Sequence, residues 1–305
     1  MTSPVPLVEV VRSGLREGLH HGSAVVVDPQ GGPLLSLGST TAPMYPRSSL
    51  KPAQATAMLR CGLDLPSADL ALAASSHSGE QDHVRRVAAL LERFSLTEDD
   101  LRCPPDLPMD ETARRGASVE RRITMNCSGK HAAMLATCVI NGWSTADHLD
   151  PKHPLQVAIA DTVVELAGEP LAGTGVDGCG APLFAISLTG LARVFQRVVG
   201  TPVGAAMREH PWLVAGTDRQ DTYLMAAVPG LISKIGAEGV FAFALPDGRA
   251  AAIKVADGAG RPRLPIAVGL LDRLGITGLE HLAEEPVLGG GRPVGSVRLI
   301  PGALG

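Results

Sequence analysis

Two stretches with the pattern of β-hairpins lie near opposite ends of this chain, and a long helix-patterned segment separates them. Near the N-terminus, the β-type runs 24–28 and 34–38 are separated by a turn rich in glycine and proline. Near the C-terminus, the runs 239–245 and 251–255 flank Asp247-Gly248, a pair that favours a tight turn. Strands at both ends therefore predict one antiparallel sheet, with the middle of the chain folded as an insertion.

The rest of the chain divides into helical and strand patterns. In the middle, apolar residues at helical spacing predict helices over 84–94, 131–139, 154–166 and 183–199. Outside it, we predict a strand over 7–12, a helix over 264–274 that ends before Gly275, an edge strand over 296–300 and a loop at 289–291.

These elements predict an α+β protein of the α/β sandwich type. Residues 1–47 and 232–305 are expected to form an antiparallel sheet domain with a C-terminal helix. Residues 48–231 are expected to form a mainly helical domain, with catalytic residues where the two domains meet.

Composition narrows the class of function. The chain has 305 residues, 45% of them hydrophobic, and a formal net charge of −4, so nothing in it suggests binding to nucleic acid or an anionic membrane. Charged residues interrupt the first twenty positions, which argues against an export or membrane-spanning segment and for a cytoplasmic protein. The five cysteines are too few for a disulfide framework and are expected to be thiols or metal ligands.

The run Arg47-Ser48-Ser49-Leu50-Lys51-Pro52 carries the most suggestive chemistry. If a helix opens at Ser48, Ser48 and Lys51 lie on one helical face. Serine alone is a poor nucleophile, and a lysine becomes a base when burial or a neighbouring cation lowers its pKa. The ordinary alternative is a serine that caps a helix, followed by a surface lysine.

Four further runs contain reactive groups. The segment 75–80 places three serines and a histidine in a possible active-site loop, although it also resembles a helix cap. Cys127 and Cys179 each lie beside glycines and polar residues, which invites a shared zinc ion, with buried thiols as the alternative. Ser233-Lys234-Ile235-Gly236 resembles the Lys-Thr-Gly element of penicillin-recognising enzymes.

The order of these motifs resembles that of serine β-lactamases, penicillin-binding proteins and serine-dependent glutaminases. The chain resembles most closely the asparaginase II family, the Rhizobium etli type of L-asparaginase. The resemblance spans most of the chain and lies in these runs: 46–52, 76–80, Asn126-Cys127-Ser128-Gly129-Lys130-His131, Asp177-Gly178-Cys179-Gly180, His210-Pro211 with 214–216, and 234–239.

That resemblance implies hydrolysis of the side-chain amide of L-asparagine to L-aspartate and ammonia, through a β-aspartyl ester on Ser48. The catalytic pairs it implies are Ser48 with Lys51 and Ser78 with Lys234. An oxyanion hole is expected from the N–H of Ser48 and an N–H of the strand after Lys234. We also expect a homodimer.

The resemblance further implies a Zn²⁺ ion held by Cys127, Lys130 and Cys179, which we expect to orient substrate. From position and charge, Arg47, His131 and Asp177 are expected to bind the carboxylate and ammonium of the substrate. The alternatives are a glutaminase, a β-lactamase-like serine hydrolase and a non-catalytic zinc-binding protein. A zinc-binding protein without turnover would leave the two lysines without a role.

Overall fold

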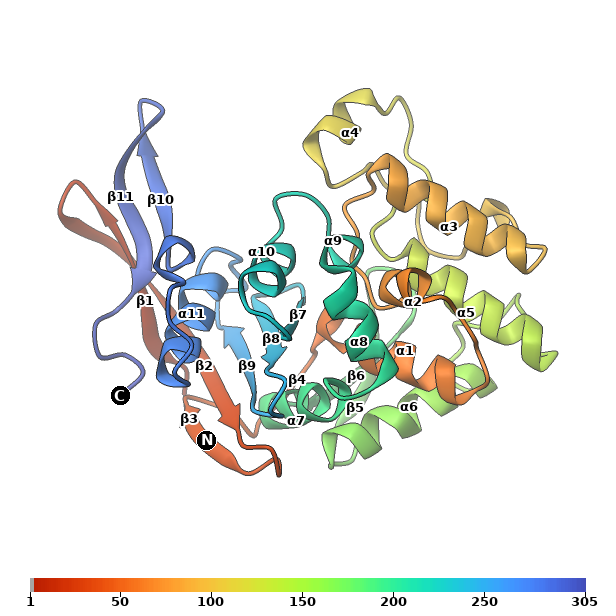
Figure 1. Ribbon diagram of the computed structural model, residues 1–305, viewed down its shortest axis with the longest axis horizontal. Coiled ribbons are helices and arrows are strands. Elements are labelled where there is room, and N and C mark those ends of the chain that lie inside the picture. The colour runs from red at the N-terminus through yellow and green to blue at the C-terminus, as the bar shows by residue number, and fades with distance from the viewer. Residues whose placement is uncertain (1–2) are drawn as a thin grey trace.

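The computed structural model of the protein describes residues 3–305. Its main sheet is antiparallel and combines strands from both ends of the chain (Figure 1). The strand order is β10 (Glu284–Gly289), β11 (Arg292–Leu299), β1 (Val5–Arg12), β2 (Leu15–Val27), β9 (Ala250–Val255), β8 (Val240–Ala244) and β7 (Ile232–Ile235), and β3 (Pro33–Leu37) also pairs with β2.

The centre of this sheet is covered on both faces. Successive side chains of a strand point to opposite faces, and every residue of β8 is buried. The helices α7 (Leu188–Val198) and α11 (Arg263–Arg273) both pack against β8 and β9. The strands that lead toward the site are therefore held in a closed core.

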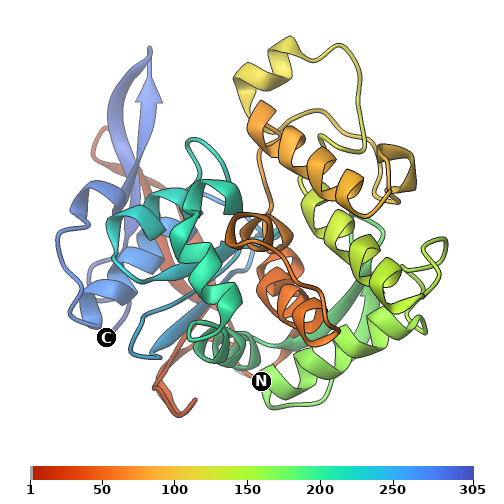
Figure 2. The same cartoon turned by 45° about the vertical axis from the view of Figure 1, so that its right-hand side comes forward.

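A helical layer lies beside the sheet. Its central helix is α1 (Lys51–Arg60), which contacts α5, α6, α7 and α8 and is buried along most of its length (Figure 2). A proline near its start is compatible with the first helical turn, where an N–H has no acceptor within the helix. The other helices are η1 (Arg47–Leu50), α2 (Ser67–Ala73), α3 (Gln81–Arg93), η2 (Glu98–Asp100), α4 (Glu111–Gly116), α5 (Ser128–Asn141), α6 (Pro154–Ala167), α8 (Pro202–Glu209), α9 (Pro211–Val214), α10 (Gln220–Ala227) and η3 (Glu280–Leu282).

Most of the predicted elements are confirmed. Both hairpins form, as β2–β3 and β8–β9, and the α+β class with a sheet built from both chain ends is confirmed. The helices expected over 84–94, 131–139, 154–166 and 264–274 correspond to α3, α5, α6 and α11. Of the loop expected at 289–291, Gly289 ends β10, and residues 290–291 make the turn to β11.

Two predictions were wrong. The helix expected over 183–199 is a strand, β6 (Pro182–Ser187), followed by α7. β6 is buried throughout and pairs with β4 (Pro43–Met44) and β5 (Gly173–Val176) in a second sheet, and a short apolar run cannot be distinguished from a buried helix by periodicity alone. The strand over 296–300 is not at an edge, because β11 lies between β10 and β1.

The division of the chain at residues 47 and 232 stays a prediction. Although α7 belongs to the middle segment, it packs against the sheet strands β2, β8 and β9. No helix within residues 3–305 combines the length and the apolar character needed to cross a bilayer.

Candidate active site

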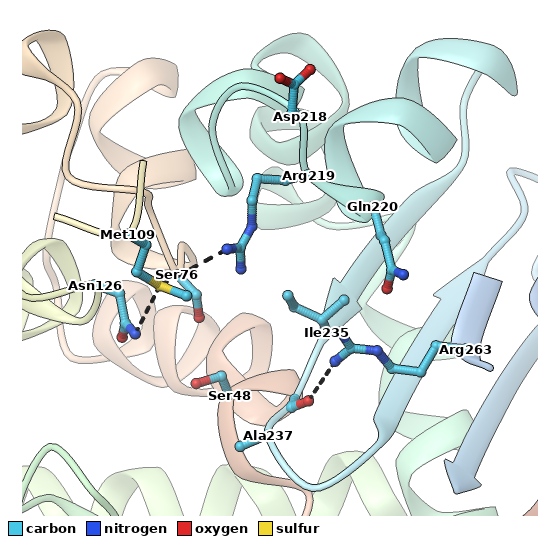
Figure 3. A pocket seen from close by; sticks show the side chains of 11 residues that line it. Ser48, Ser76, Met109, Asn126, Asp218, Arg219, Gln220, Ile235, Ala237 and Arg263 are labelled. Atoms are coloured by element: carbon cyan, nitrogen blue, oxygen red, sulfur yellow. Dashed lines mark hydrogen bonds between the residues drawn. The ribbon is translucent and has the colours of Figure 1, made fainter. Parts of the chain in front are cut away.

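Ser48 lies in η1, directly before α1, and faces a cavity of about 400 Å³ (Figure 3). The preceding residue, Arg47, has a φ of 55°, in the left-handed region that non-glycine residues rarely adopt. Such strain persists only where the surroundings enforce it, and it is concentrated at functional sites. The backbone thus turns sharply where it presents the Ser48 hydroxyl.

Lys51 connects this turn to the segment 75–80, the loop that contains Ser75, Ser76 and Ser78. Its side chain is only 1% exposed, and its Nζ donates to the carbonyl of Ser75 at 2.6 Å and to Oγ of Ser76 at 2.9 Å. Ser76 lines the same cavity as Ser48. Within residues 3–305, Lys51 makes no hydrogen bond to Ser48, so the direct serine–lysine contact is made by Ser76.

Lys234 lies on β7, fully buried. Its Nζ donates to the carbonyl of Ile235 at 3.1 Å and forms an ion pair with Asp221 at 3.4 Å. Burial lowers the pKa of the Lys234 ammonium to about 8, with Asp221 opposing the shift and Lys51 adding to it. A buried lysine with a pKa near neutrality can exchange a proton with substrate.

Ser78 is not among the residues that line the Ser48 cavity. Its Oγ donates to Oε1 of Glu80 at 2.5 Å, and the Glu80 carboxylate also accepts from the N–H and the hydroxyl of Thr217, both at 2.8 Å. The expected pairing of Ser78 with Lys234 is not formed within the described residues. Of the serines in this loop, Ser76 lines the cavity beside Ser48 and contacts Lys51. The role of Ser78 stays a prediction.

Arg47 and Asp177 bind each other. Nε of Arg47 donates to Oδ1 of Asp177 at 2.7 Å, and a guanidinium nitrogen lies 3.9 Å from the Glu238 carboxylate. Arg47 and Glu238 line a neighbouring cavity of about 480 Å³. The two charges that we expected to bind substrate therefore offset one another.

The two cysteines and the lysine predicted to bind zinc come together. Cys127 and Lys130 belong to the start of α5, Cys179 lies between β5 and β6, and all three are buried. Nζ of Lys130 is 3.2 Å from Sγ of Cys179. Asn126, which lines the Ser48 cavity, accepts a hydrogen bond from the Cys127 thiol at 2.9 Å.

The protonation of the two thiols differs. The neighbouring Cys127 side chain, together with the charge of Lys130, holds the pKa of Cys179 well below its usual range, although burial opposes the shift. The proximity of Cys179, followed by burial, raises the pKa of Cys127. Burial alone would lower the pKa of Lys130, but the charges of Cys179 and Cys127 raise it. These directions favour the thiolate form of Cys179, the thiol form of Cys127 and the ammonium form of Lys130.

This donor set fits zinc. Two sulfurs and one amine nitrogen converge, and zinc prefers sulfur and nitrogen ligands in a four-coordinate shell. Within residues 3–305, no group of three or more histidine, cysteine, aspartate or glutamate side chains could hold a metal ion, so Lys130 would have to be the third donor.

His131 is fully buried next to this cluster. Burial lowers the pKa of its ring, with Cys179 opposing the shift, so the ring is favoured in its neutral form. A neutral ring can accept or donate a hydrogen bond, but it offers no charge to a substrate carboxylate.

Sequence reasoning missed Ser76, Asp221, Arg219 and Arg263. Ser76 belonged to a motif that we had singled out, but three serines in one short run cannot be ranked without the backbone path. Asp221 and the two arginines stand in no motif, and only the fold brings them to Ser48 and Lys234.

Known structures resemble this one at low sequence identity. A β-lactamase from Mycobacterium bovis is 16% identical, with 86% of this chain and 95% of that chain covered and a TM-score of 0.41. The structure described as Mglu in its native form is 13% identical, with 83% and 64% covered and a TM-score of 0.47. A hydrolase with promiscuous acyltransferase activity is 12% identical, with 77% and 88% covered and a TM-score of 0.40.

No curated protein matches the chain at a significant level. The family comparison is more informative, because the model for L-asparaginase II matches residues 8–299 and so includes every residue of the site described above. The chain belongs to the L-asparaginase II family.

Proposed function

We propose that this protein hydrolyses the side-chain amide of L-asparagine to L-aspartate and ammonia through an ester on Ser48. Membership of the family supports an amidohydrolase of the asparaginase type. The observation that supports the serine mechanism is the cavity shared by Ser48 and Ser76. The Lys51 amine donates a hydrogen bond to the Ser76 hydroxyl.

In the first half of the reaction, Oγ of Ser48 attacks the amide carbon, and its proton passes to a lysine amine. Lys51 follows Ser48 by one helical turn and is bonded to Ser76, so it is placed to receive that proton directly or through the Ser76 hydroxyl. The negative charge on the amide oxygen would be held by two N–H groups. These belong to Ser48, near a helix start where N–H groups lack intrahelical acceptors, and to Ala237 beyond β7 (Figure 3).

In the second half, the tetrahedral species collapses, and the C–N bond breaks as the leaving nitrogen takes up a proton. We assign the relay of that proton to Ser76 and Lys234, and the pKa of about 8 lets Lys234 gain and lose a proton near neutral pH. Water then attacks the β-aspartyl ester, which releases L-aspartate and restores the Ser48 hydroxyl.

Zinc binding belongs to the same proposal. Cys127, Lys130 and Cys179 would hold Zn²⁺, which when bound supplies fixed positive charge beside the cavity. Asn126 joins the two sites, because it lines the cavity and directly precedes Cys127 in the chain. The position of the cysteine cluster therefore fixes the position of Asn126 in the cavity wall. The homodimer stays a prediction.

The test compares three serines. Ser48→Ala should lower ammonia release from L-asparagine by at least about a thousandfold, and Ser76→Ala by about a hundredfold or more, because each removes a group in the proton path. Ser78→Ala, the matched control in the same loop, should change it by less than tenfold. Thermal midpoints should show that all three variants fold, since the loss of one hydroxyl hydrogen bond costs only about 1 kcal/mol.

L-Glutamine and a chromogenic cephalosporin serve as competing substrates. Faster hydrolysis of either would favour the glutaminase or β-lactamase alternative, and no turnover of any substrate would favour a zinc-binding protein. An inactive Ser78→Ala beside an active Ser76→Ala would restore the original assignment of Ser78.

A further inference from the structure

Two arginines reach the Ser48 cavity from different parts of the fold. Arg219 lies just before α10, and Arg263 is the first residue of α11. Figure 3 shows the Arg219 guanidinium above Ser48 and the Arg263 guanidinium beside the end of β7. A cavity that receives two guanidinium groups is positively charged and favours an anionic group on its ligand.

Neither guanidinium has a carboxylate partner within residues 3–305. Among the described residues, the only polar contact of Arg219 is with Sδ of Met109, at 4.0 Å. Arg263 donates to two backbone carbonyls, those of Gly236 at 3.0 Å and Gly260 at 3.1 Å. The remaining N–H groups are free to bind a ligand.

The acidic residues near the cavity are already occupied. Asp221 is fully buried and paired with Lys234. Asp218 also lines the cavity and accepts from the Tyr223 hydroxyl at 2.5 Å. Among the described lining residues, Asp218 carries the only carboxylate, so two guanidinium groups face one carboxylate that already accepts a hydrogen bond.

A neutral acceptor is available instead. Oε1 of Gln220 is buried without a hydrogen-bond partner in the described chain, and its side chain points into the cavity (Figure 3). An amide oxygen can accept from an amino group, but it does not balance a positive charge as a carboxylate does.

We infer that Arg219 and Arg263 bind the α-carboxylate of the amide that Ser48 attacks, so that the pocket selects its substrate by the carboxylate rather than by the ammonium. The planar guanidinium matches a carboxylate with two parallel hydrogen bonds. The inference rests on the proposed amide hydrolysis at Ser48. Arg263 also ties the start of α11 to the end of β7, whereas Arg219 has almost no internal contact, so Arg219 gives the sharper test.

Two analogues of L-asparagine each lack one charge. Succinamate keeps the carboxylate and lacks the amino group, and 3-aminopropanamide keeps the amino group and lacks the carboxylate. We expect kcat/KM for succinamate to lie within about tenfold of that for L-asparagine, and kcat/KM for 3-aminopropanamide to be at least about a hundredfold lower. Equal use of the two analogues, or a preference for 3-aminopropanamide, would overturn the inference.

The variants separate binding from folding. Arg219→Gln should raise KM for L-asparagine by about tenfold to a hundredfold with a smaller change in kcat, because it removes charged hydrogen bonds to the bound substrate. Arg219→Lys should recover part of the loss. The control is Arg261→Gln, an exposed arginine near Arg263 whose partner is Glu285 at 2.8 Å, and it should leave KM unchanged. An unchanged KM in Arg219→Gln would refute the role of Arg219.

Direct binding keeps this inference distinct from the proposed function. Calorimetric titration of succinamate into Ser48→Ala should detect binding, and the added Arg219→Gln substitution should weaken it by at least about tenfold. If the wild type hydrolyses no amide, the proposed function fails, and this titration still decides the role of Arg219. If binding to Ser48→Ala is absent, or unaffected by Arg219→Gln, the inference fails even where L-asparagine is hydrolysed.

Discussion

Around Ser48, several residues combine burial with charge or have an unfavourable backbone conformation, which is rare in an ordinary protein core. Lys51 and Lys234 are almost completely buried amines, Asp221 is a fully buried carboxylate, and Arg47 has a left-handed backbone. Burial of charged groups without full pairing reduces stability, so such groups usually persist for function. These four residues are the strongest local indication of an active site.

The pKa of Lys234 predicts how activity depends on pH. Because burial lowers that pKa from 10.5 to about 8, Lys234 loses the proton that it relays to the leaving nitrogen as the pH rises through 8, and kcat/KM should fall along a limb with a midpoint near 8. Folding stability should rise with pH between about 8 and 10.5, because the unfolded chain binds more protons there. Measurement of kcat/KM and of the free energy of unfolding across this pH range tests the two effects.

Asp221 should determine the pH at which this change in kcat/KM has its midpoint. Since its carboxylate raises the pKa of Lys234, Asp221→Asn should move the midpoint to lower pH. Asp218→Asn, which alters a carboxylate bonded to the Tyr223 hydroxyl rather than to Lys234, should leave the midpoint in place. An identical midpoint in wild type and Asp221→Asn would show that another group produces the limb.

At the scale of elements, the site depends on the contact between η1 and β7. The first carries Ser48, the second carries Lys234, and the two are packed together. Gly236, just beyond β7, makes this approach possible, because a Cβ there would lie 2.4 Å from the carbonyl oxygen of Pro46. A side chain at this position would have to separate the two elements.

Gly236→Ala should therefore impair activity more than stability. We expect a free-energy loss of about 1–3 kcal/mol from the overpacked contact and a fall in kcat of about tenfold or more, because Ser48 is displaced. Gly200→Ala is the matched control, since a Cβ at Gly200 would meet no atom within 4 Å. Calorimetry and ammonia release measure the two losses, and full activity in Gly236→Ala would contradict the required close contact.

At the scale of the whole molecule, the cysteine cluster joins segments that are distant in the chain. Cys127 and Lys130 come from the start of α5, and Cys179 comes from the loop before β6. A ligand that binds only the folded protein stabilises it by mass action. A zinc ion in this cluster would therefore stabilise the contact between these segments.

Elemental analysis should find about one zinc per chain in protein purified without added metal. Removal of the metal with a chelator should lower the free energy of unfolding by about 2.7 kcal/mol, if free zinc had exceeded its dissociation constant a hundredfold. Cys179→Ser should lose the metal, whereas Cys61→Ser, a partly exposed cysteine at the end of α1, should keep it. Active protein without zinc would refute this site and leave the serine mechanism intact.

The amino-acid sequence alone determined the two hairpins, the main helices and the motifs around Ser48, Cys127, Cys179 and Lys234. Turn chemistry and hydrophobic periodicity are local properties, so they can be recognised without a fold. Periodicity failed at β6, a short buried run whose strand character depends on the neighbours β4 and β5.

Only the tertiary structure decided which side chains meet. It placed Ser76 against Lys51, paired Arg47 with Asp177 and Lys234 with Asp221, and brought Arg219 and Arg263 to one cavity. Each of these contacts depends on the direction of a side chain and on packing between distant segments. Side-chain direction and long-range packing are not encoded in a local pattern of residues, because burial and charge pairing arise only when the chain is folded.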